Sequence, residues 1–442
     1  MTHAKVDEDT EGRVLEEVER RSAELVDLII ELVGFDTTAR GVDDPPREEA
    51  QLQELLEERL RKAGAETDLW EPSQRDVAGS RLTPEGLAFD GRPQLVARFP
   101  GVGGGRSLLF NGHIDVVSSE PRDRWTSDPD RAEVRDGNIY GRGTCDMKGG
   151  IASMVIAAEA LASLGVRLRG DLLVCTVTDE ESTGCGALAA VAHGVRADAG
   201  VVTEPSSLTA WVACRGAVIP TVTVPGRPGH AGMQQPAWRE GGAVNAIEKA
   251  VVVMNALREL EDDWRTRRDL EHRYVPSADM VATSISAGEW MVSYPASCEV
   301  VYHVAYPPTQ ADIDGWGSVV MEEIAEAIRR TAAADPWLAE HPPTIRWSQE
   351  VPSAEVDDDS AIVQIVVEAS GDAGRPSRPT GFHSWFDGAT FTRFGSTPSI
   401  GFGPGDLGVA HTIDEYVPIR DVVDCSKALA LSALRFCGVD PA

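Results

Sequence analysis

Short polar segments that directly follow apolar runs constrain this chain more than any other feature of its sequence. Residues 111–117 (NGHIDVV) carry His113 and Asp115, and residues 141–150 (GRGTCDMKGG) carry Asp146 further along the chain. Later segments of the same kind contribute Glu180, Glu181, Glu204 and His411. Open α/β sheets place ligands at the carboxyl ends of their strands, so these side chains are candidates for one site. Two histidines and several carboxylates are what a pair of zinc-like ions needs.

The length and charge of the chain limit its fold and its partners. With 442 residues the chain is too long for one ordinary core, so we expect two domains. The formal net charge of −30 argues against nucleic acid, because phosphate binding needs clustered lysines and arginines. It also disfavours an anionic membrane surface. No run of about 18 apolar residues occurs, so we expect no membrane span.

The cysteines predict a reducing compartment. There are seven of them, an odd number, and no two form a CxxC pair. A disulfide framework is therefore not expected. The first twenty or so residues are polar and mostly acidic, without an apolar signal segment. We therefore expect a cytoplasmic protein.

The first half of the chain reads as an α/β layer fold. Apolar residues recur at helical spacing over residues 11–34 and 47–64, and residues 149–164 form a third, small-residue helix. Strands are predicted at 95–99, 108–110, 172–178 and 199–203, the third an apolar run typical of a parallel sheet covered on both faces. The glycine-rich residues 100–105 are predicted to be a hairpin turn rather than a dinucleotide loop, because they open no helix.

The pattern changes after Cys214. Strands at 217–224, 280–286, 298–306 and 344–347 alternate with helices at 241–260 and 313–333, which is the β-α-β-β-α-β order of a ferredoxin-like unit. From about residue 354 onward, the helix and strand patterns again resemble those of the first half of the chain. We therefore expect residues 214–349 to be a domain inserted into a larger one, formed by residues 1–213 and 350–442.

Each polar segment has a functional and a simpler interpretation. Asp115 shares a strand face with His113, or curls back so that its carboxylate holds the far ring nitrogen of a metal-bound His113, or both belong to a polar turn. Asp146 bridges two cations or caps the helix that follows.

The later segments leave the same choice open. Adjacent carboxylates at residues 179–181 repel one another, so cations would compensate them, with one carboxylate left over as general base. The simpler interpretations are a solvated acidic turn here and a surface loop histidine at His411. All five segments would have to be accidental for the simpler account to hold throughout, which favours a metal site.

The order of these segments resembles the dinuclear zinc hydrolase family of acetylornithine deacetylase, succinyl-diaminopimelate desuccinylase, aminoacylase and carboxypeptidase G. The matching segments are residues 112–117, 141–149, 179–181, 203–206, 229–232 and 410–416. The resemblance implies an α/β/α domain with a mixed sheet, and an inserted ferredoxin-like domain that acts as a lid and dimerises.

The resemblance also implies roles for single residues. His113 and Glu204 would bind one ion, Glu181 and His411 the other, and Asp146 both. Glu180 would be the general base, and Asp115 would orient His113. Zinc is the first expectation for the two divalent ions, with cobalt and manganese as alternatives.

The remaining implied roles concern the substrate. His230, in the insert, would stabilise the oxyanion in the partner subunit's active site, and Asn245 matches a substrate-contacting position. The chain departs from the family where His303 and Ala305 replace an aspartate and an arginine. Arg215 then becomes a candidate cation for the substrate. His383, with Trp385 and Phe386, is a candidate for an aromatic pocket wall. The simpler interpretations are a surface or hinge arginine for Arg215 and a packed aromatic turn for the His383 cluster.

We therefore predict a metal-dependent amidohydrolase that acts on a small N-acyl amino acid and forms a homodimer through the inserted domain. A di- or tripeptidase is the second candidate. The third is a deformylase or aminohydrolase of an aromatic amine, which the missing arginine and the aromatic cluster suggest. A metal-binding but inactive regulator is the non-enzymatic alternative, although a scaffold would not need Glu180.

Overall fold

The computed structural model describes residues 7–41 and 44–440, which fall into two compact units. The first unit runs to Ala213 and resumes at Glu355–Gly381 and at Phe386. The second comprises Cys214–Ala354 and the short segment Phe382–Trp385. The chain thus enters the second unit once as a long insert and once as a four-residue loop, whose two ends belong to the first unit.

The first unit is built on a mixed nine-stranded sheet. The order along it is β1-β2-β6-β3-β7-β15-β8-β13, with β14 also paired to β8. The strands are β1 Glu66–Trp70, β2 Gln94–Phe99, β3 Leu108–His113, β6 Leu172–Val177, β7 Ala199–Val202, β8 Ala210–Cys214, β13 Ala354–Glu355, β14 Pro379–Phe382 and β15 Ser399–Gly401. β3 runs parallel to β6 and β7, and β15 parallel to β7, so these four strands end at one edge. A separate small sheet has the order β16-β5-β4, from Tyr416–Pro418, Asn138–Tyr140 and Glu133–Arg135.

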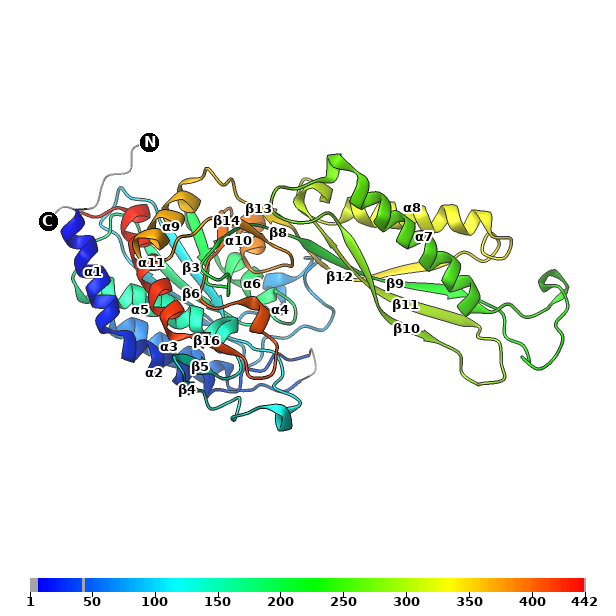
Figure 1. Cartoon of the computed structure of the whole chain (residues 1–442), viewed down its shortest axis with the longest axis horizontal. Helices are drawn as coiled ribbons and strands as arrows, with labels where there is room; N and C mark the ends of the chain where they lie inside the picture. Colours follow the sequence, from blue (N-terminus) through cyan, green and yellow to red (C-terminus); the bar gives the residue numbers. More distant parts are fainter. Residues whose placement is uncertain (1–6, 42–43, 441–442) are drawn as a thin grey trace. The chain divides into compact units, whose positions relative to one another are not determined.

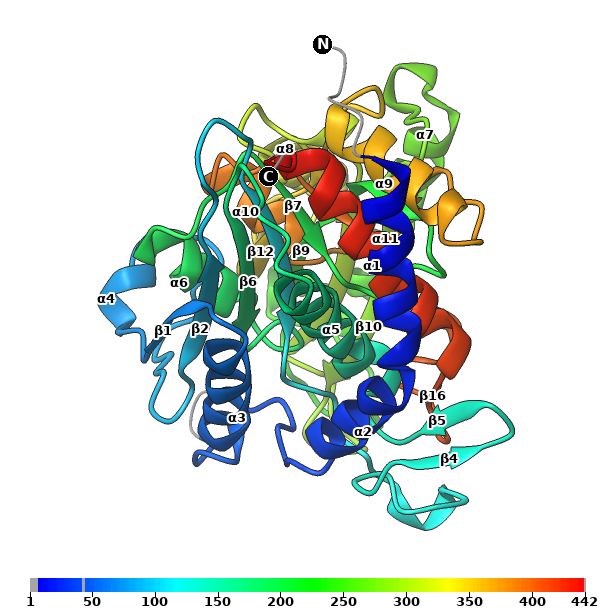
Figure 2. The ribbon, with the colours of Figure 1, turned by 90° about the vertical axis from the view of Figure 1, so that its left-hand side faces the viewer.

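Helices cover both faces of the large sheet. On one side α5 packs against α11, and α1, α2 and α9 complete the layer (Figure 2). On the other side α6 and α10 bury Leu109 and Leu173. The helices are α1 Glu8–Arg20, α2 Ser22–Val33, α3 Glu49–Lys62, α4 Gln74–Val77, α5 Gly149–Ser163, α6 Cys185–His193, α9 Ala361–Asp372, α10 Gly388–Phe394 and α11 Ile419–Cys437. The single helix expected over residues 11–34 is two helices that meet at Arg21.

The predicted hairpin at residues 100–105 is wrong. Strand β6 lies between β2 and β3 and pairs with both, antiparallel to β2 and parallel to β3. The glycines serve a close backbone approach instead, because a Cβ at Gly101 would lie 2.5 Å from the carbonyl carbon of Gly170 and one at Gly105 would lie 2.1 Å from the Cys437 oxygen. Local sequence could not reveal this, since the partner strand lies 64 residues away in the chain, as the pairing of Leu108 with Leu172 shows.

The second unit is an antiparallel four-stranded sheet in the order β10-β11-β9-β12, with α7 and α8 packed on one face (Figure 1). Its strands are β9 Gly216–Pro225, β10 Asp279–Ala287, β11 Ser297–Tyr306 and β12 Thr344–Val351, and its helices are α7 Ala246–Thr266 and α8 Ser318–Ala334. The order of elements is the ferredoxin-like one expected from the sequence. Trp264, Tyr302 and Ile324 lie in its core.

None of the helices in residues 7–41 and 44–440 combines the length and apolar character that crossing a bilayer requires.

Candidate metal centre

Three parallel strands deliver polar side chains to the same edge of the large sheet. His113 is the last residue of β3, Glu180 and Glu181 follow β6, and Glu204 follows β7. The register pairs His113 with Val177 and Asn111 with Val202, so the three strands end at nearly the same level. These strands are buried along their whole length and carry no acidic or basic residue before their ends.

Asp146 reaches this edge from the turn Thr144–Lys148, which leads into α5. The turn is held by Glu415, whose Oε1 accepts hydrogen bonds from the backbone N–H groups of Cys145 and Asp146 at 2.9 and 3.1 Å. Gly150 allows the start of α5 to approach the end of β7, since a Cβ there would lie 2.0 Å from the Thr203 oxygen. Asp146 is therefore not the helix cap that the simpler interpretation required; Lys148 occupies that position.

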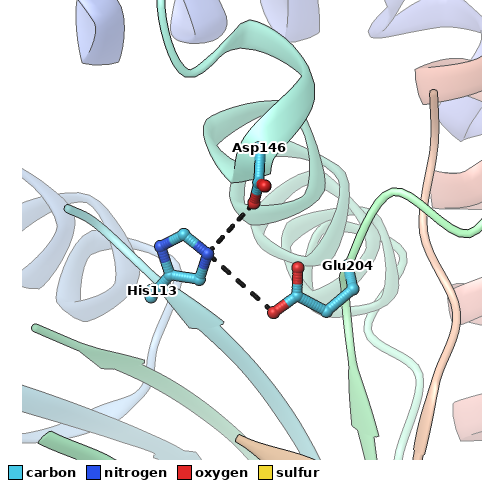
Figure 3. A group of neighbouring side chains, drawn as sticks. All are labelled: His113, Asp146 and Glu204. Carbon is cyan, nitrogen blue, oxygen red and sulfur yellow. Dashed lines mark hydrogen bonds and ion pairs between the residues drawn. The ribbon is translucent and has the colours of Figure 1, made fainter. Parts of the chain in front are cut away.

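The first group of candidate ligands consists of His113, Asp146 and Glu204 (Figure 3). The Nε2 atom of His113 lies 3.1 Å from Asp146 Oδ1 and 3.8 Å from Glu204 Oε1. All three side chains are buried, and Glu204 Oε1 has no hydrogen-bond partner among the described residues. A buried carboxylate oxygen without a donor, aimed at an imidazole nitrogen, is the arrangement that a cation would complete.

The second group consists of Asp146, Glu181 and His411. The Nε2 atom of His411 lies 2.9 Å from Glu181 Oε1 and 3.4 Å from Asp146 Oδ2. Asp146 therefore presents one oxygen to each group. The His411 side chain is 49% exposed, so this group opens toward solvent while the first is enclosed.

The hydrogen bond of His113 Nδ1 directs Nε2 toward the carboxylates of the first group, where it lies 3.1 Å from Asp146 Oδ1. Its Nδ1 lies 2.9 Å from the backbone oxygen of Asp115, which is a position for Nδ1–H to donate and so selects the tautomer. The Asp115 carboxylate is 3.7 Å from Nδ1 and instead accepts the backbone N–H groups of Glu180 and Glu181, at 3.3 and 3.0 Å. Asp115 thus orients both the imidazole, through its carbonyl, and the Glu180–Glu181 loop, through its carboxylate.

The electrostatics of the cluster favour cations. Burial works against charge on His113, but its hydrogen bond to Asp146 and the neighbouring carboxylates raise its pKa well above the ordinary value. Hydrogen bonds to Asp146 and Glu181 raise the pKa of His411 to about 10. The cluster therefore attracts positive charge strongly, and its mixed nitrogen and oxygen donors fit divalent transition-metal ions.

Glu180 differs from its neighbours. It is partly exposed, and within the described ranges no hydrogen bond or ion pair engages its carboxylate. Burial and the nearby charges of Glu204, Asp387 and Glu181 raise its pKa well above the ordinary value. A carboxylate held beside the candidate ligands but outside both groups, with a raised pKa, suits proton transfer.

The other candidate residues lie in the second unit. His230 is exposed on a turn, where its Nδ1 accepts the N–H of Gly232 at 3.1 Å. Asn245 caps α7 by accepting the N–H of Ile247 at 3.0 Å. This local role does not require a substrate.

Arg215 and His383 occur together in the second unit. The Arg215 guanidinium donates from Nε to the carbonyl oxygen of His383 and from Nη1 to Asp279, both at 2.8 Å. The His383 side chain is exposed, whereas His303 is half-buried, and burial lowers its pKa. These contacts join Arg215 to the Phe382–Trp385 loop and to β10, and its role toward a substrate stays a prediction.

Two supporting residues were not assigned roles from the sequence. Arg142 forms a buried ion pair with Glu415, with Nη1 2.5 Å from Oε2, and thereby supports the Asp146 turn. Asp387 is completely buried at the start of α10. The sequence contains both, but only their burial distinguishes them from surface charges.

Several known proteins resemble this chain over most of its length. Residues 109–435 match the model of peptidase family M20/M25/M40. An acetylornithine deacetylase of Myxococcus xanthus is 30% identical over 414 residues, covering 93% of this chain and 97% of its own. An N-formyl-4-amino-5-aminomethyl-2-methylpyrimidine deformylase of Halalkalibacterium halodurans is 26% identical over 449 residues, covering 96% and 97%. The fold is that of a tripeptidase from Staphylococcus aureus, with a TM-score of 0.69 at 19% identity over 93% of this chain and 98% of that one.

Proposed function

The chain belongs to peptidase family M20/M25/M40 and is a hydrolase of C–N bonds, and on that premise we propose that it uses two divalent cations to cleave the amide of a small N-acyl amine. The observation that carries this proposal is Asp146, which presents one carboxylate oxygen to each of two ligand groups. A single-ion protein would have no use for the second group.

We assign the ligands from the two groups. His113 and Glu204 hold one cation, Glu181 and His411 hold the other, and Asp146 holds both. Bound cations of this kind supply Lewis acidity, which lowers the pKa of water and polarises a carbonyl group. Zinc is the first choice for this donor set, and cobalt or manganese would be accommodated by the same side chains.

Glu180 is assigned as the general base. Its carboxylate takes a proton from the attacking water and passes it to the leaving nitrogen. The Asp115 carboxylate keeps the Glu180 backbone in place while its carbonyl orients His113. In this proposal Glu180 transfers the proton, and Asp115 holds Glu180 and His113 in position.

The test of this proposal is Glu180→Gln. The variant should keep both metals, measured by elemental analysis, and lose turnover by about 10²- to 10⁴-fold, the usual contribution of a positioned base. Glu133→Gln, at an exposed glutamate, is the matched control and should behave as the unaltered protein. Retention of turnover within tenfold would show that Glu180 is not the base.

Two substrate classes deserve separate assays. An N-acetyl amino acid is favoured by the acetylornithine deacetylase relative, which is 30% identical. An N-formyl aminomethyl heteroaromatic amine is favoured by the deformylase relative and by His303 and Ala305, which remove the family's arginine. Arg215 stays the candidate cation for the substrate, and its hydrogen bonds to Asp279 and to the His383 carbonyl would fix the direction of its guanidinium.

The assay is a panel of N-acetyl, N-succinyl and N-formyl amines and dipeptides with the metal-loaded enzyme. Hydrolysis of the N-formyl aromatic amine at least a hundredfold faster than of any N-acetyl amino acid would favour the second class. Cleavage of dipeptides alone would identify a peptidase and overturn both.

We propose that residues 214–354 form a lid domain that also joins two copies of the chain. Strand β10 is at the edge of its sheet, and Val281 and Ile285 on it are 56% and 55% exposed. An exposed apolar edge strand is a template for pairing with another chain. His230 would then serve as an oxyanion donor to the other copy's active site.

The dimer is tested by light scattering with size-exclusion chromatography. The unaltered protein should elute as a dimer and Ile285→Lys as a monomer. Val102→Lys, at an exposed valine of the first unit, is the control and should stay dimeric. A monomeric unaltered protein would contradict the proposal. The seven free cysteines support a reducing compartment, and we place the protein in the cytoplasm.

A further inference from the structure

His411 is a candidate ligand that lies on a loop rather than at a strand end. The loop joins β15 to β16 over residues 402–415, which we call the His411 loop, and the His411 side chain is 49% exposed. Among the residues that the structure describes, no hydrogen bond engages its Nδ1 atom, whereas Nδ1 of His113 lies 2.9 Å from the backbone oxygen of Asp115. The direction of the His411 imidazole therefore depends on how firmly its loop is fixed.

The backbone of the His411 loop adopts an uncommon conformation at two residues. His411 has a φ of 59° and Asp414 a φ of 58°, in the left-handed region that residues other than glycine seldom enter. Such conformations persist only where the surrounding structure fixes them. The contacts that hold this loop thus decide whether the imidazole stays beside Glu181 and Asp146.

Asp414 is held by a second loop, residues 117–132, which precedes β4 and which we call the Thr126 loop. The backbone N–H of Thr126 donates to Asp414 Oδ1 at 2.8 Å, and the Thr126 hydroxyl donates to Oδ2 at 2.6 Å. One residue supplies both donors and one carboxylate supplies both acceptors, so the two bonds fix the distance and the orientation of the pair. Hydrogen bonds to a carboxylate are stronger than those between neutral groups.

Arg142 joins the same two loops from the buried side. Its Nη2 atom donates to the backbone oxygens of Ser118 and Thr412, each at 3.3 Å. Its guanidinium carbon lies 5.0 Å from the centre of the Trp125 ring. The Thr126 loop is therefore anchored inside the protein, which lets it hold the exposed end of the His411 loop.

We propose that Thr126 is a positioning residue for the cation of the second group, because its two hydrogen bonds to Asp414 hold the His411 loop with the imidazole at the metal centre. This inference rests on the proposed two-cation site. Thr126 contacts neither cation nor substrate and acts through Asp414 and His411. The first group has two of its ligands at strand ends and does not depend on this contact.

Loss of the Thr126–Asp414 contact should lower the affinity for one cation and leave the affinity for the other unchanged. Removal of a group that orients a metal ligand typically weakens metal binding by about 10- to 100-fold. Tenfold corresponds to about 1.4 kcal/mol, which is comparable to one hydrogen bond to a charged group.

The experiment is titration of the chelator-stripped whole chain with Zn²⁺ against a competing chelator dye, which gives the affinity of each successive zinc ion. Thr126→Val removes the hydroxyl at an exposed position, and Asp414→Gly removes both acceptors while allowing the positive φ. Both variants should bind the second zinc ion at least about tenfold more weakly and the first with unchanged affinity. Thr126→Ser, which keeps the hydroxyl, should bind both ions as the unaltered protein does.

Thr10→Val is the matched control. Thr10 makes the same pair of hydrogen bonds with Asp7 at the start of α1, from N–H to Oδ1 at 2.9 Å and from the hydroxyl to Oδ2 at 2.7 Å. That contact involves no candidate ligand, so both zinc affinities should be unchanged. His411→Ala identifies the site, because it removes a ligand of the second group alone and should lose the second zinc ion.

The outcomes distinguish this inference from the proposed function. If the unaltered protein binds fewer than two zinc ions, or if His411→Ala still binds two, the assignment of the two-cation site fails and this inference fails with it. If His411→Ala loses the second ion but either Thr126→Val or Asp414→Gly binds that ion as tightly as the unaltered protein, only the positioning role of Thr126 fails. Equal weakening of both ions in these two variants would also overturn that role, because the contact would then support the whole centre.

Discussion

The ion pair between Arg142 and Glu415 offers the sharpest test of how the Asp146 turn is held. Both side chains are almost completely buried, at 4% and 0% exposure, and their closest atoms are 2.5 Å apart. Glu415 also accepts the backbone N–H groups of Cys145 and Asp146. The change Glu415→Gln keeps an oxygen for those two donors but removes the negative charge, which leaves the Arg142 guanidinium buried without a counter-charge.

The expected loss follows from that stranded charge. Removing one partner of a buried ion pair costs about 3–5 kcal/mol, against a typical total of about 5–15 kcal/mol for the free energy of unfolding. Urea unfolding followed by circular dichroism measures it. Glu66→Gln is the matched control, because the Arg98–Glu66 pair is 45% and 65% exposed and its loss should cost less than about 1 kcal/mol.

A second substitution tests the reason for the loss. Adding Arg142→Met to Glu415→Gln removes the stranded charge and should recover part of the lost stability, since apolar groups can replace buried ion pairs at little cost. If Glu415→Gln destabilises the protein no more than Glu66→Gln does, Arg142 is not left uncompensated and the account of the turn is wrong.

Two further predictions concern packing and thiol chemistry. Gly150→Ala should lower the free energy of unfolding by about 1–3 kcal/mol or more, because its Cβ would lie 2.0 Å from the Thr203 oxygen. Gly12→Ala in α1 is the control: its Cβ meets no atom within 4 Å, so the change should be neutral or stabilising. Urea unfolding of both variants measures the difference. Native protein at pH 8 should react with a thiol reagent slowly and at far fewer than its seven cysteines, because all are buried and burial raises the pKa of Cys185 to about 11. Unfolded protein should react at all seven, and labelling of the native protein should become faster as the pH rises toward 11. Rapid labelling of the native protein at pH 8 would contradict the burial.

The candidate metal ligands were more predictable from the sequence than the residues that hold them in place. His113, Glu181 and Glu204 were identifiable because each follows an apolar strand, and parallel strands bring their ends to one edge. The structure joins Asp146 and His411 to them in two groups. The way Asp115 acts was not predictable, since the choice between its carbonyl and its carboxylate depends on where the Glu180–Glu181 backbone lies.

The strands themselves were predictable from local sequence, but their order in the sheet was not. The periodicity of residues 95–99 and 108–110 predicted two strands, yet their separation by β6 depends on a partner far along the chain. The order of elements in the second unit was also visible in the sequence, whereas the addition of Phe382–Trp385 to that unit arises from its contacts, among them the Arg215–His383 hydrogen bond.

The sequence by itself determined which side chains of this protein are candidates to bind cations and move a proton, because residue type and position after an apolar run are local properties. The tertiary structure alone decided which charges are compensated. Asp387 and Glu415 are both acids near the C-terminal end of the chain, and both are buried, but only Glu415 lies against an arginine. The free energy of a buried charge depends on the groups that folding brings to it, and no local pattern encodes that.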